Sequence, residues 1–372
     1  MPDRLRALVV TSALVPSQMH TWQAASELPE IDLHLAGSLV SDPSESYPGP
    51  VGVPAWGTTH VLGAGGMPSR GRLWWRLDGL EELVDRLRPD VVHVHSEAWG
   101  RLVSQTLETG VPTIAHGAEN VSLTHGCRLE ARIRQAVAGR NARRLGGYAS
   151  WNQGGIDVLR RNGLGPAAPV AVAPAISPDP SPFLVVEATE ERPRPVCVGY
   201  IGRLVPEKGV QWLIASLAGI DGVTLRVIGT GSYEAELRRQ AERAGVTVEW
   251  LGALTGSELP AALTDIDVVV VPSLTSPGWS EQFGRVVCEA MYAGVPVVTS
   301  DSGALPEVVG DAGIVVPELD HHRLHHELAR LVGDARLRQE LGERGRIRAL
   351  VHLAPGAAAT HLRQLWQEVA AS

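Results

Sequence analysis

Two rounds of alternating strands and helices, separated by a linker, constrain the fold of this chain more than any other feature. The linker spans residues 174–195 (PAISPDPSPFLVVEATEERPRP) and is rich in proline, serine and acidic residues, a composition that resists regular secondary structure. Strands that alternate with helices pair in parallel, because each helix returns the chain to the same end of the sheet. The sequence therefore predicts an α/β protein with two doubly wound, Rossmann-like domains of parallel sheet.

The length of the chain agrees with this division, since 372 residues exceed one ordinary domain and suit two. We expect an N-terminal domain at 1–180, which the C-terminal helix at 355–372 rejoins, and a C-terminal domain at 181–354. Two facing sheets of this kind leave a cleft at the carboxyl ends of their strands, where α/β proteins bind ligands.

Hydrophobic periodicity and turn residues place the individual elements. The strands expected in the N-terminal half are 5–14, 31–36, 90–95, 111–115, 147–150 and 170–173, with a short strand near 52–56. The helices expected there are 73–87, 100–109, 128–145 and 152–163. The strands expected in the C-terminal half are 196–201, 223–228, 247–251, 267–271, 295–299 and 312–316. The helices expected there are 208–219, 233–244, 256–265, one that contains Glu289 and ends at Gly294, and further helices from 319 onward.

Composition excludes several classes of protein. The formal net charge of −8 argues against a surface that binds the phosphate backbone of nucleic acids. No apolar run approaches the roughly 20 residues of a membrane span, and the N-terminus lacks the shape of a signal peptide. The three cysteines lie far apart without a CxxC pair, which argues against a disulfide frame or a zinc site. A cytoplasmic protein is expected; the sequence carries no signal for its oligomeric state.

The stretch 279–307 carries two carboxylates that can face one crevice. Glu281 lies in a loop, and Glu289 lies in the following helix, which Gly294 and Pro296 terminate. The next residues, Val295–Thr299, have the continuous apolar character of a buried parallel strand. Surface or capping roles remain the simpler explanation for either glutamate alone.

Arg203 and Lys208 follow the first strand of the C-terminal half. Lys208 is the only lysine in a chain with 33 basic residues, so its position in the turn Gly202–Gly209 draws attention. Two cations beside the positive end of a helix suit a diphosphate. An exposed surface pair is the alternative explanation.

Four successive strands of this half reach the same edge with small or polar turn residues, among them Gly202, Gly229, Gly231 and Gly252. These turns resemble the donor-binding domain of family 4 of the retaining GT-B glycosyltransferases, also described as glycosyl transferases group 1. The resemblance also includes Arg203, Glu207–Gly209, Pro272–Ser273, the E-x7-E pair Glu281 and Glu289, and Gly303–Glu307.

The resemblance implies a role for each matching residue. Arg203 and Lys208 would hold the diphosphate of a UDP-, GDP- or ADP-sugar and stabilise the charge that develops as it leaves, so no metal or other cofactor is expected. Glu281 would bind the sugar hydroxyls, and Glu289 would bind the ribose. Further donor contacts would come from Gly202, Gly229, Gly231, Leu251, Leu254, Gln282, Phe283 and Gly284. The two glutamates would then position the donor, unlike the carboxylate pair of a glycosidase.

The N-terminal half follows the family less closely. His116 matches the position whose histidine touches the transferred sugar. Where the family has a Gly-Gly turn after the first strand, this chain has Ser17-Gln-Met-His20, so contacts of that loop do not carry over. The remaining candidates for binding the acceptor, a small molecule, a glycan or a lipid, are His20, His95, Glu97, Trp99, Glu119 and Asn120.

Residues 128–145 predict an arginine-rich helix, for which a solvated face is favoured over contact with a membrane surface. Three other interpretations of the whole chain stay open. These are a non-catalytic protein that binds a nucleotide sugar, a nucleotide-sugar epimerase of the same fold, and a phosphorylase, which would need its single lysine for pyridoxal phosphate.

Overall fold

A computed structural model of the chain describes residues 4–40, 50–66, 73–124, 127–184, 195–254 and 257–372. The chain divides into two compact units. Unit 1 comprises Met1–Ser177 and Pro355–Ser372, and unit 2 comprises Pro178–Ala354. The boundary predicted from the sequence lies after residue 180, and residues 185–194 of the predicted linker lie outside the described part of the chain.

Unit 1 is built on a seven-stranded sheet in the order β3-β2-β1-β6-β7-β8-β9, and every adjacent pair in it is parallel. Its strands are β1 (Leu5–Ala13), β2 (Ile31–Ser38), β3 (Thr58–Val61), β6 (Val91–His95), β7 (Thr113–Gly117), β8 (Gly147–Ser150) and β9 (Val170–Val172). A separate antiparallel pair is formed by β4 (Gly63–Gly66) and β5 (Trp75–Asp78).

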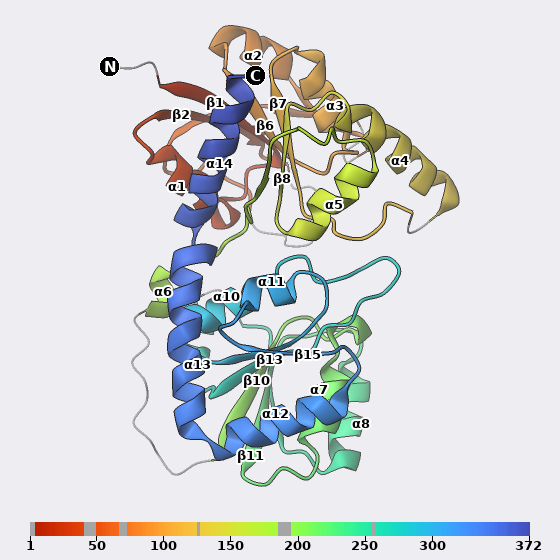
Figure 1. Ribbon diagram of the computed structural model, residues 1–372, viewed down its shortest axis with the longest axis vertical. Helices are drawn as coiled ribbons and strands as arrows, with labels where there is room; N and C mark the ends of the chain where they lie inside the picture. Colours follow the sequence, from red (N-terminus) through yellow and green to blue (C-terminus); the bar gives the residue numbers. More distant parts are fainter. Residues whose placement is uncertain (1–3, 41–49, 67–72, 125–126, 185–194, 255–256) are drawn as a thin grey trace. The chain divides into compact units, whose positions relative to one another are not determined.

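Helices cover both faces of this sheet (Figure 1). They are η1 (Pro16–Gln18), α1 (His20–Ser26), α2 (Leu80–Leu87), α3 (Arg101–Glu108), α4 (Arg128–Ala142), α5 (Gln153–Arg161) and α14 (Pro355–Ala370). Successive residues of β1 enter opposite cores: Ala7 and Val9 pack with α1 and α14, whereas Leu8 and Val10 pack with α2, α3 and α5. The continuous apolar run Ala7–Val10 thus reflects a strand buried on both faces.

The last helix of the chain packs on unit 1, with Leu362, Leu365, Trp366 and Val369 buried against the core that contains Trp22. Trp366 Nε1 donates a hydrogen bond of 2.9 Å to His93 Nδ1 on β6, a partner 273 residues earlier in the sequence. The C-terminal helix predicted at 355–372 therefore packs on the N-terminal core, as expected.

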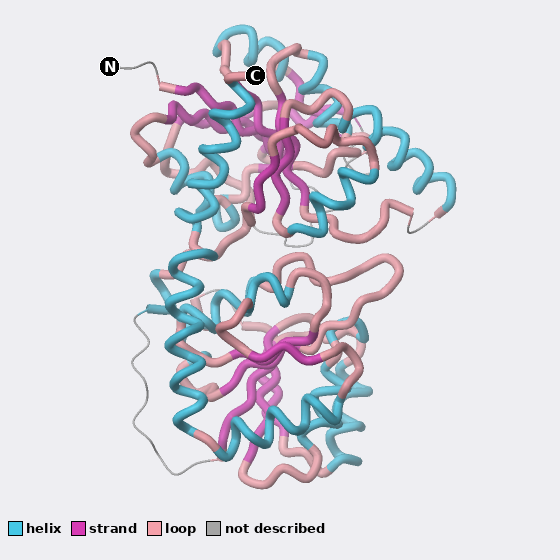
Figure 2. The backbone as a smooth tube through the Cα atoms, viewed as in Figure 1, coloured by secondary structure: helices cyan, strands magenta, loops and turns pink. Residues whose placement is uncertain are grey.

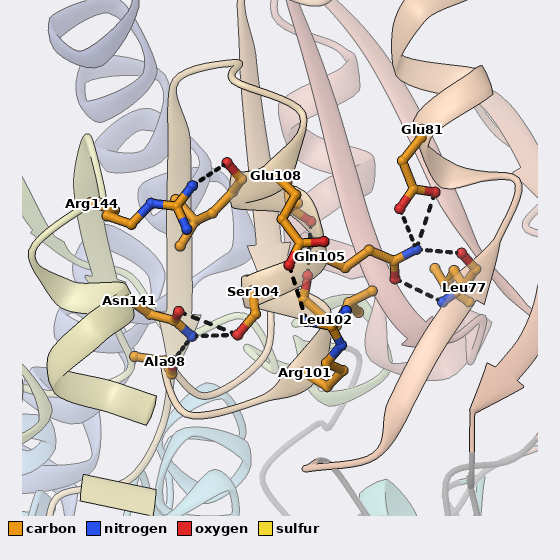
Figure 3. A network of polar contacts seen from close by, with 12 residues as sticks. Leu77, Glu81, Ala98, Arg101, Leu102, Ser104, Gln105, Glu108, Asn141 and Arg144 are labelled. Carbon is orange, nitrogen blue, oxygen red and sulfur yellow. Dashed lines mark hydrogen bonds and ion pairs between the residues drawn. The ribbon is translucent and has the colours of Figure 1, made fainter. Parts of the chain in front are cut away.

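The predicted helix at 73–87 is wrong in its first half, where the chain forms β5 before α2 begins at Leu80. In this stretch β5 pairs with β4, and the buried Gln105 side chain of α3 also bonds to the backbone of Leu77 (Figure 3). Gln105 Nε2 donates to Leu77 O at 2.7 Å, and Gln105 Oε1 accepts from Leu77 N at 3.0 Å. A contact 28 residues away thus overrides the helical periodicity of the leucines.

The arginine-rich helix α4 ends at Ala142, three residues before the predicted end. Asn141, fully buried, donates to Ala98 O at 2.8 Å and shares hydrogen bonds with Ser104 Oγ (Figure 3). Arg144 Nη2 donates to Leu107 O at 2.8 Å, so this guanidinium anchors the chain on the carboxyl end of α3. At this end of the segment, polar side chains that looked solvated therefore fix helix packing.

Two further details of unit 1 differ from the sequence predictions. The short strand expected near 52–56 lies further on, as β3 and β4. The first turn after β1 continues into α1, a helix that the periodicity did not indicate.

Unit 2 contains a six-stranded parallel sheet in the order β12-β11-β10-β13-β14-β15, drawn in magenta in Figure 2. Its strands are β10 (Val196–Ile201), β11 (Val223–Ile228), β12 (Val248–Gly252), β13 (Val268–Val271), β14 (Val297–Ser300) and β15 (Ile314–Val316). The helices are α6 (Ser181–Leu184), η3 (Pro206–Lys208), α7 (Val210–Leu217), α8 (Glu234–Ala244), α9 (Leu259–Leu263), α10 (Arg285–Tyr292), α11 (Leu305–Val309), α12 (His321–Gly333), α13 (Ala335–Arg348) and the π-helix η4 (Ala349–Leu353).

The core of unit 2 packs α7, α8 and α12 on one face of the sheet. The helix α10 contacts β13 and β14, and α13 contacts β14. The prediction of two parallel-sheet α/β domains is confirmed by both units. None of the helices in the described part of the chain is both long and apolar enough to cross a membrane.

Candidate active site

The turns at the carboxyl ends of the unit 2 strands interlock through their backbones. Gly202 N donates to Ile228 O at 2.9 Å, and Gly229 N donates to Gly252 O at 2.7 Å. Gly229 has a φ of +137°, and a Cβ there would overlap the carbonyl oxygen of Gly202. A Cβ on Gly231 would likewise overlap the carbonyl oxygen of Leu204. These glycines therefore let neighbouring turns pack closely, and the result is one continuous backbone platform at this edge of the sheet.

An ion pair lies on this platform. Lys208 Nζ is 2.7 Å from Glu281 Oε2, with side chains 15% and 6% exposed. Ser273 lies in the turn after β13, and its Oγ donates a hydrogen bond of 2.8 Å to the same carboxylate oxygen. Two of the residues proposed from the sequence are thus in direct contact, and Glu281 has two donors on one oxygen.

The ammonium group of Lys208 has a second neighbour, the indole of Trp279. Nζ lies 4.7 Å from the ring centroid, within the range of a cation–π contact. Trp279 belongs to a turn closed in both directions, with Ser276 N donating to Trp279 O at 2.8 Å and Trp279 N donating to Ser276 O at 3.2 Å.

Arg203, in contrast, is exposed at the carboxyl end of β10. Its carbonyl oxygen accepts a hydrogen bond of 2.7 Å from Tyr200 Oη, which fixes the backbone of the turn below it. Burial raises the pKa of Tyr200, and the charge of Glu281 raises it further, so the phenol remains a hydrogen-bond donor. The guanidinium is therefore presented on a rigid turn, beside the Lys208 segment.

Glu289 lies in α10, where it is buried and accepts a hydrogen bond of 2.9 Å from Arg285 Nε. Burial raises the pKa of Glu289, while the charge and hydrogen bond of Arg285 oppose that rise. The i, i+4 spacing brings the two side chains together on one face of the helix.

The remaining donor-side candidates surround these pairs. Gly284 begins α10 with a φ of +75°, and Phe283 before it is buried. Gln282 is partly exposed, and Ala304 N donates to Glu281 O at 2.8 Å, which ties this loop to the start of α11. Leu251 is 45% exposed at the end of β12, an apolar surface beside the platform, and Leu254 is partly exposed.

In unit 1, three histidines gather around the buried Trp22. The Trp22 ring lies 5.1 Å from that of His93 and 5.8 Å from those of His95 and His116. His93 Nε2 and His116 Nδ1 are 3.0 Å apart, and His116 Nε2 is 2.8 Å from Ala173 O.

The partners of these rings assign their tautomers. Because Trp366 donates to His93 Nδ1, His93 must donate through Nε2 to His116 Nδ1, and His116 then donates through Nε2 to Ala173 O. Burial lowers the pKa of His93 to about 3 and lowers that of His116 well below its usual value, so both rings are neutral. His116 is 1% exposed with both nitrogens engaged. A contact between His116 and a sugar would require it to give up one of these two hydrogen bonds.

The other candidates of unit 1 follow β6 and β7. Glu97 is buried, and its Oε1 accepts from Ala118 N at 2.8 Å and Glu119 N at 3.1 Å, so this carboxylate shapes the loop after β7. Trp99 Nε1 donates to Glu119 Oε2 at 2.8 Å. His95, Asn120 and His20, the last of which begins α1, are partly exposed.

The structure adds three residues to which the sequence analysis gave no role. Ser273 and Trp279 contact the Lys208–Glu281 pair, and Arg285 contacts Glu289. The i, i+4 spacing of Arg285 and Glu289 could have predicted their contact on one helix face. The Trp279 contact depends on the path of a loop. Among the residues that the structure describes, no group of three or more His, Cys, Asp or Glu side chains is arranged to hold a metal ion.

The sequence around this site is similar to that of known glycosyl transferases. Residues 185–348 match the family described as "Glycosyl transferases group 1". A GDP-mannose-dependent alpha-(1-6)-phosphatidylinositol monomannoside mannosyltransferase of Mycobacterium tuberculosis is 36% identical over 166 residues, which are 42% of each chain. A 2-deoxystreptamine N-acetyl-D-glucosaminyltransferase of Streptomyces fradiae is 30% identical over 277 residues, 67% of this chain and 63% of that protein. The chain thus matches less than two thirds of the length of either relative.

Solved structures share the fold of the whole chain. Sucrose-phosphate synthase from Thermosynechococcus elongatus superposes with a TM-score of 0.71 at 19% identity, covering 99% of this chain and 100% of that one. HepE of Anabaena in complex with UDP superposes with a TM-score of 0.69 at 18% identity, covering 97% of this chain and 99% of that one. These similarities support the GT-B fold class, with a Rossmann-like fold in each unit.

Proposed function

We propose that the chain belongs to the glycosyl transferases group 1 family, whose model matches residues 185–348, and that it transfers a sugar from a nucleoside-diphosphate sugar to a hydroxyl acceptor. The observation that carries the proposal is the Lys208–Glu281 pair on the platform of unit 2. A cation for the leaving diphosphate and a carboxylate for the sugar hydroxyls lie there in direct contact.

The proposed mechanism assigns the chemistry to charge and position. Lys208 and Arg203 bind the diphosphate and stabilise the negative charge that grows on it as the glycosidic bond breaks. Glu281, held by Ser273, accepts hydrogen bonds from the sugar, and Glu289 accepts them from the ribose. Because two cations stabilise the charge, the reaction proceeds without a metal ion. The bond from the anomeric carbon to the diphosphate breaks, and the acceptor hydroxyl attacks the same face with retention. The hydroxyl proton passes to an oxygen of the departing diphosphate.

We favour a small soluble acceptor. The Streptomyces fradiae relative is named for transfer to 2-deoxystreptamine, and its match covers 67% of this chain. Residues 178–372 make up a smaller share of the chain than that. That similarity therefore extends into the sequence of unit 1, the acceptor-binding half in the resemblance. Phosphatidylinositol, named in the mycobacterial relative, is the lipid alternative.

A donor screen tests the proposal. Wild-type protein is incubated with UDP-, GDP- and ADP-sugars, with 2-deoxystreptamine or phosphatidylinositol vesicles as acceptor, and both transfer and donor hydrolysis are followed. Lys208→Ala and Glu281→Ala should each lose transfer by about 100-fold or more. Wild-type transfer rates in both variants would overturn the site assignment.

A non-catalytic role in binding nucleotide sugars is the second candidate. It is favoured by His116, whose nitrogens are both engaged within unit 1, and by the turn after β1, which has no Gly-Gly. Binding of a donor by wild-type protein, without transfer or hydrolysis of any donor, would establish this alternative.

A further inference from the structure

The position of Lys208 is determined by two side chains that come from one loop. Residues 272–284 connect β13 to α10 and supply both Trp279 and Glu281. The Lys208 ammonium lies 2.7 Å from Glu281 Oε2 and 4.7 Å from the Trp279 ring centroid. An ammonium group has three N–H donors, so a carboxylate and an aromatic face together leave one for a further acceptor.

The loop itself is held in place independently of Lys208. Thr275 N donates to Glu318 Oε2 at 2.6 Å, and Thr275 Oγ1 contacts Ser302 Oγ at 3.0 Å. The Ser276–Trp279 bridge then closes the turn around Pro277 and Gly278. The backbone that carries Trp279 is therefore held in place, and the flexible lysine side chain lies against its ring.

Donor binding changes the partners of this lysine. If Glu281 accepts hydrogen bonds from a sugar, its interaction with Lys208 weakens at the moment the diphosphate arrives. A cation released from its carboxylate would be free to adopt many rotamers, since lysine has four rotatable bonds. The Trp279 ring can keep the ammonium in place during this exchange, because the attraction between a cation and a π face does not involve Glu281.

We propose that Trp279 is a positioning residue for Lys208, holding its ammonium beside the donor diphosphate while Glu281 binds the sugar. This inference rests on the proposed donor-binding function. It predicts that the contact between Lys208 and Trp279 persists when a nucleoside diphosphate is bound.

Spectroscopy tests this contact without any activity. Because Lys208 is the only lysine, protein grown with isotope-labelled lysine gives a single set of side-chain resonances. The ring current of Trp279 should move the Hε resonance upfield, and Trp279→Leu should remove that shift. Saturation with UDP, GDP or ADP should preserve most of the shift. Its disappearance on binding would overturn the inference.

A double-mutant cycle on nucleotide-sugar affinity tests the consequence. Trp279→Leu should raise the Kd for the UDP-, GDP- or ADP-sugar that wild type binds by about 5- to 25-fold, and Trp279→Phe by less, because the phenyl ring has a weaker π face. In the Lys208→Met background, Trp279→Leu should change Kd by less than about 2-fold, because the effect acts through Lys208. Equal effects in the two backgrounds would assign Trp279 a merely structural role.

The chain offers a matched control in Arg238. Its guanidinium also lies 4.7 Å from a tryptophan ring, that of Trp250, and pairs with Glu234 at 2.8 Å. Arg238→Met should leave Kd unchanged. Should Trp279→Leu fail to fold, Trp279→Phe provides the same comparison.

The outcomes separate this inference from the proposed function. Sugar transfer by wild type with an unchanged Kd in Trp279→Leu overturns the inference and leaves the function standing. Diphosphate binding without transfer or hydrolysis overturns the function, and the cycle on Kd still decides the role of Trp279. Failure of wild type to bind UDP, GDP or ADP overturns both.

Discussion

Lys208 Nζ lies 2.7 Å from Glu281 Oε2, although the two residues are 73 positions apart in the sequence. The pair is largely buried, and Ser273 provides the other hydrogen bond to the same oxygen. Each charge neutralises the other, so a ligand that binds both groups must exchange this ion pair for its own contacts. The strength of the pair therefore bears on both the stability of unit 2 and its affinity for a donor.

We predict that the two charges are coupled in stability. Lys208→Met should lower the free energy of unfolding of unit 2 by about 3 kcal/mol, because it leaves a buried carboxylate without its cation. The double variant Lys208→Met/Glu281→Gln should recover most of that loss, since no buried charge remains. Scanning calorimetry, which can resolve the two units, measures the difference. Additive losses in the double variant would show that the pair does not interact.

The second prediction concerns the pH dependence of donor binding. Burial raises the pKa of Glu289, and Arg285 opposes the rise. A carboxylate binds ribose hydroxyls as an acceptor above its pKa, so affinity should fall as the pH drops toward that pKa. Arg285→Met removes the opposing charge, and the fall should then begin at a higher pH than in wild type.

Calorimetric titration with the preferred nucleoside diphosphate, repeated across the acidic range, measures this shift. Glu289→Gln serves as the control, because an amide does not titrate there. Superimposable pH profiles for wild type and Arg285→Met would contradict the role of Glu289.

The parallel sheets were predictable from sequence because their signals are local. The strand β13 is an uninterrupted run of valines, and β1 contains the apolar run Ala7–Val10; both strands are followed by turn residues. The error at β5 has the opposite cause: Leu77 and Leu80 fit a helical stripe, but Gln105 supplies the backbone of Leu77 with a partner from another helix. No local pattern contains that contact.

The same distinction separates the parts of the candidate site. Glu281 and Lys208 could be predicted from the sequence because their spacing matches a family motif. Trp279 stood in the same stretch without a role, since its contact with Lys208 arises only when the loop after β13 closes on itself. The hydrogen bond between Trp366 and His93 joins the last helix to β6, and periodicity alone indicates only that Trp366 is buried.

A third prediction tests the Gln105 contact in unit 1. Gln105→Glu keeps the acceptor for Leu77 N but loses the donor to Leu77 O and places a carboxylate beside Glu81, whose Oε1 is 3.1 Å from Gln105 Nε2. The free energy of unfolding of unit 1 should fall by about 2 to 4 kcal/mol.

The swapped variant Gln105→Glu/Glu81→Gln provides the matched control for this change. Its amide at position 81 can donate to the new carboxylate, so it should be more stable than Gln105→Glu alone. Calorimetry on the three variants and wild type completes the cycle. A swapped variant as unstable as the single one would mean that the loss arises at Leu77 alone.

The last prediction concerns acid stability and follows from the neutral histidines of unit 1. The pKa of His93 is about 3 in the folded protein because the ring is buried, with His95 adding a smaller effect, against about 6.5 in an unfolded chain. Above pH 6.5 neither state binds the proton. Below it only the unfolded state does, so the free energy of unfolding should fall as the pH decreases from 6.5 toward 3, by about 2 kcal/mol at pH 5 from His93 alone.

Hydrogen exchange of peptides from β6 and α14 follows this loss in unit 1 without interference from unit 2. His93→Gln keeps an acceptor for Trp366 Nε1 and a donor for His116 Nδ1 but cannot titrate, so its protection should depend less on pH between about 7 and 5. His361→Gln, on the exposed side of α14, should retain the wild-type dependence. Equal pH dependence in wild type and His93→Gln would show that protonation of this histidine does not govern the docking of α14.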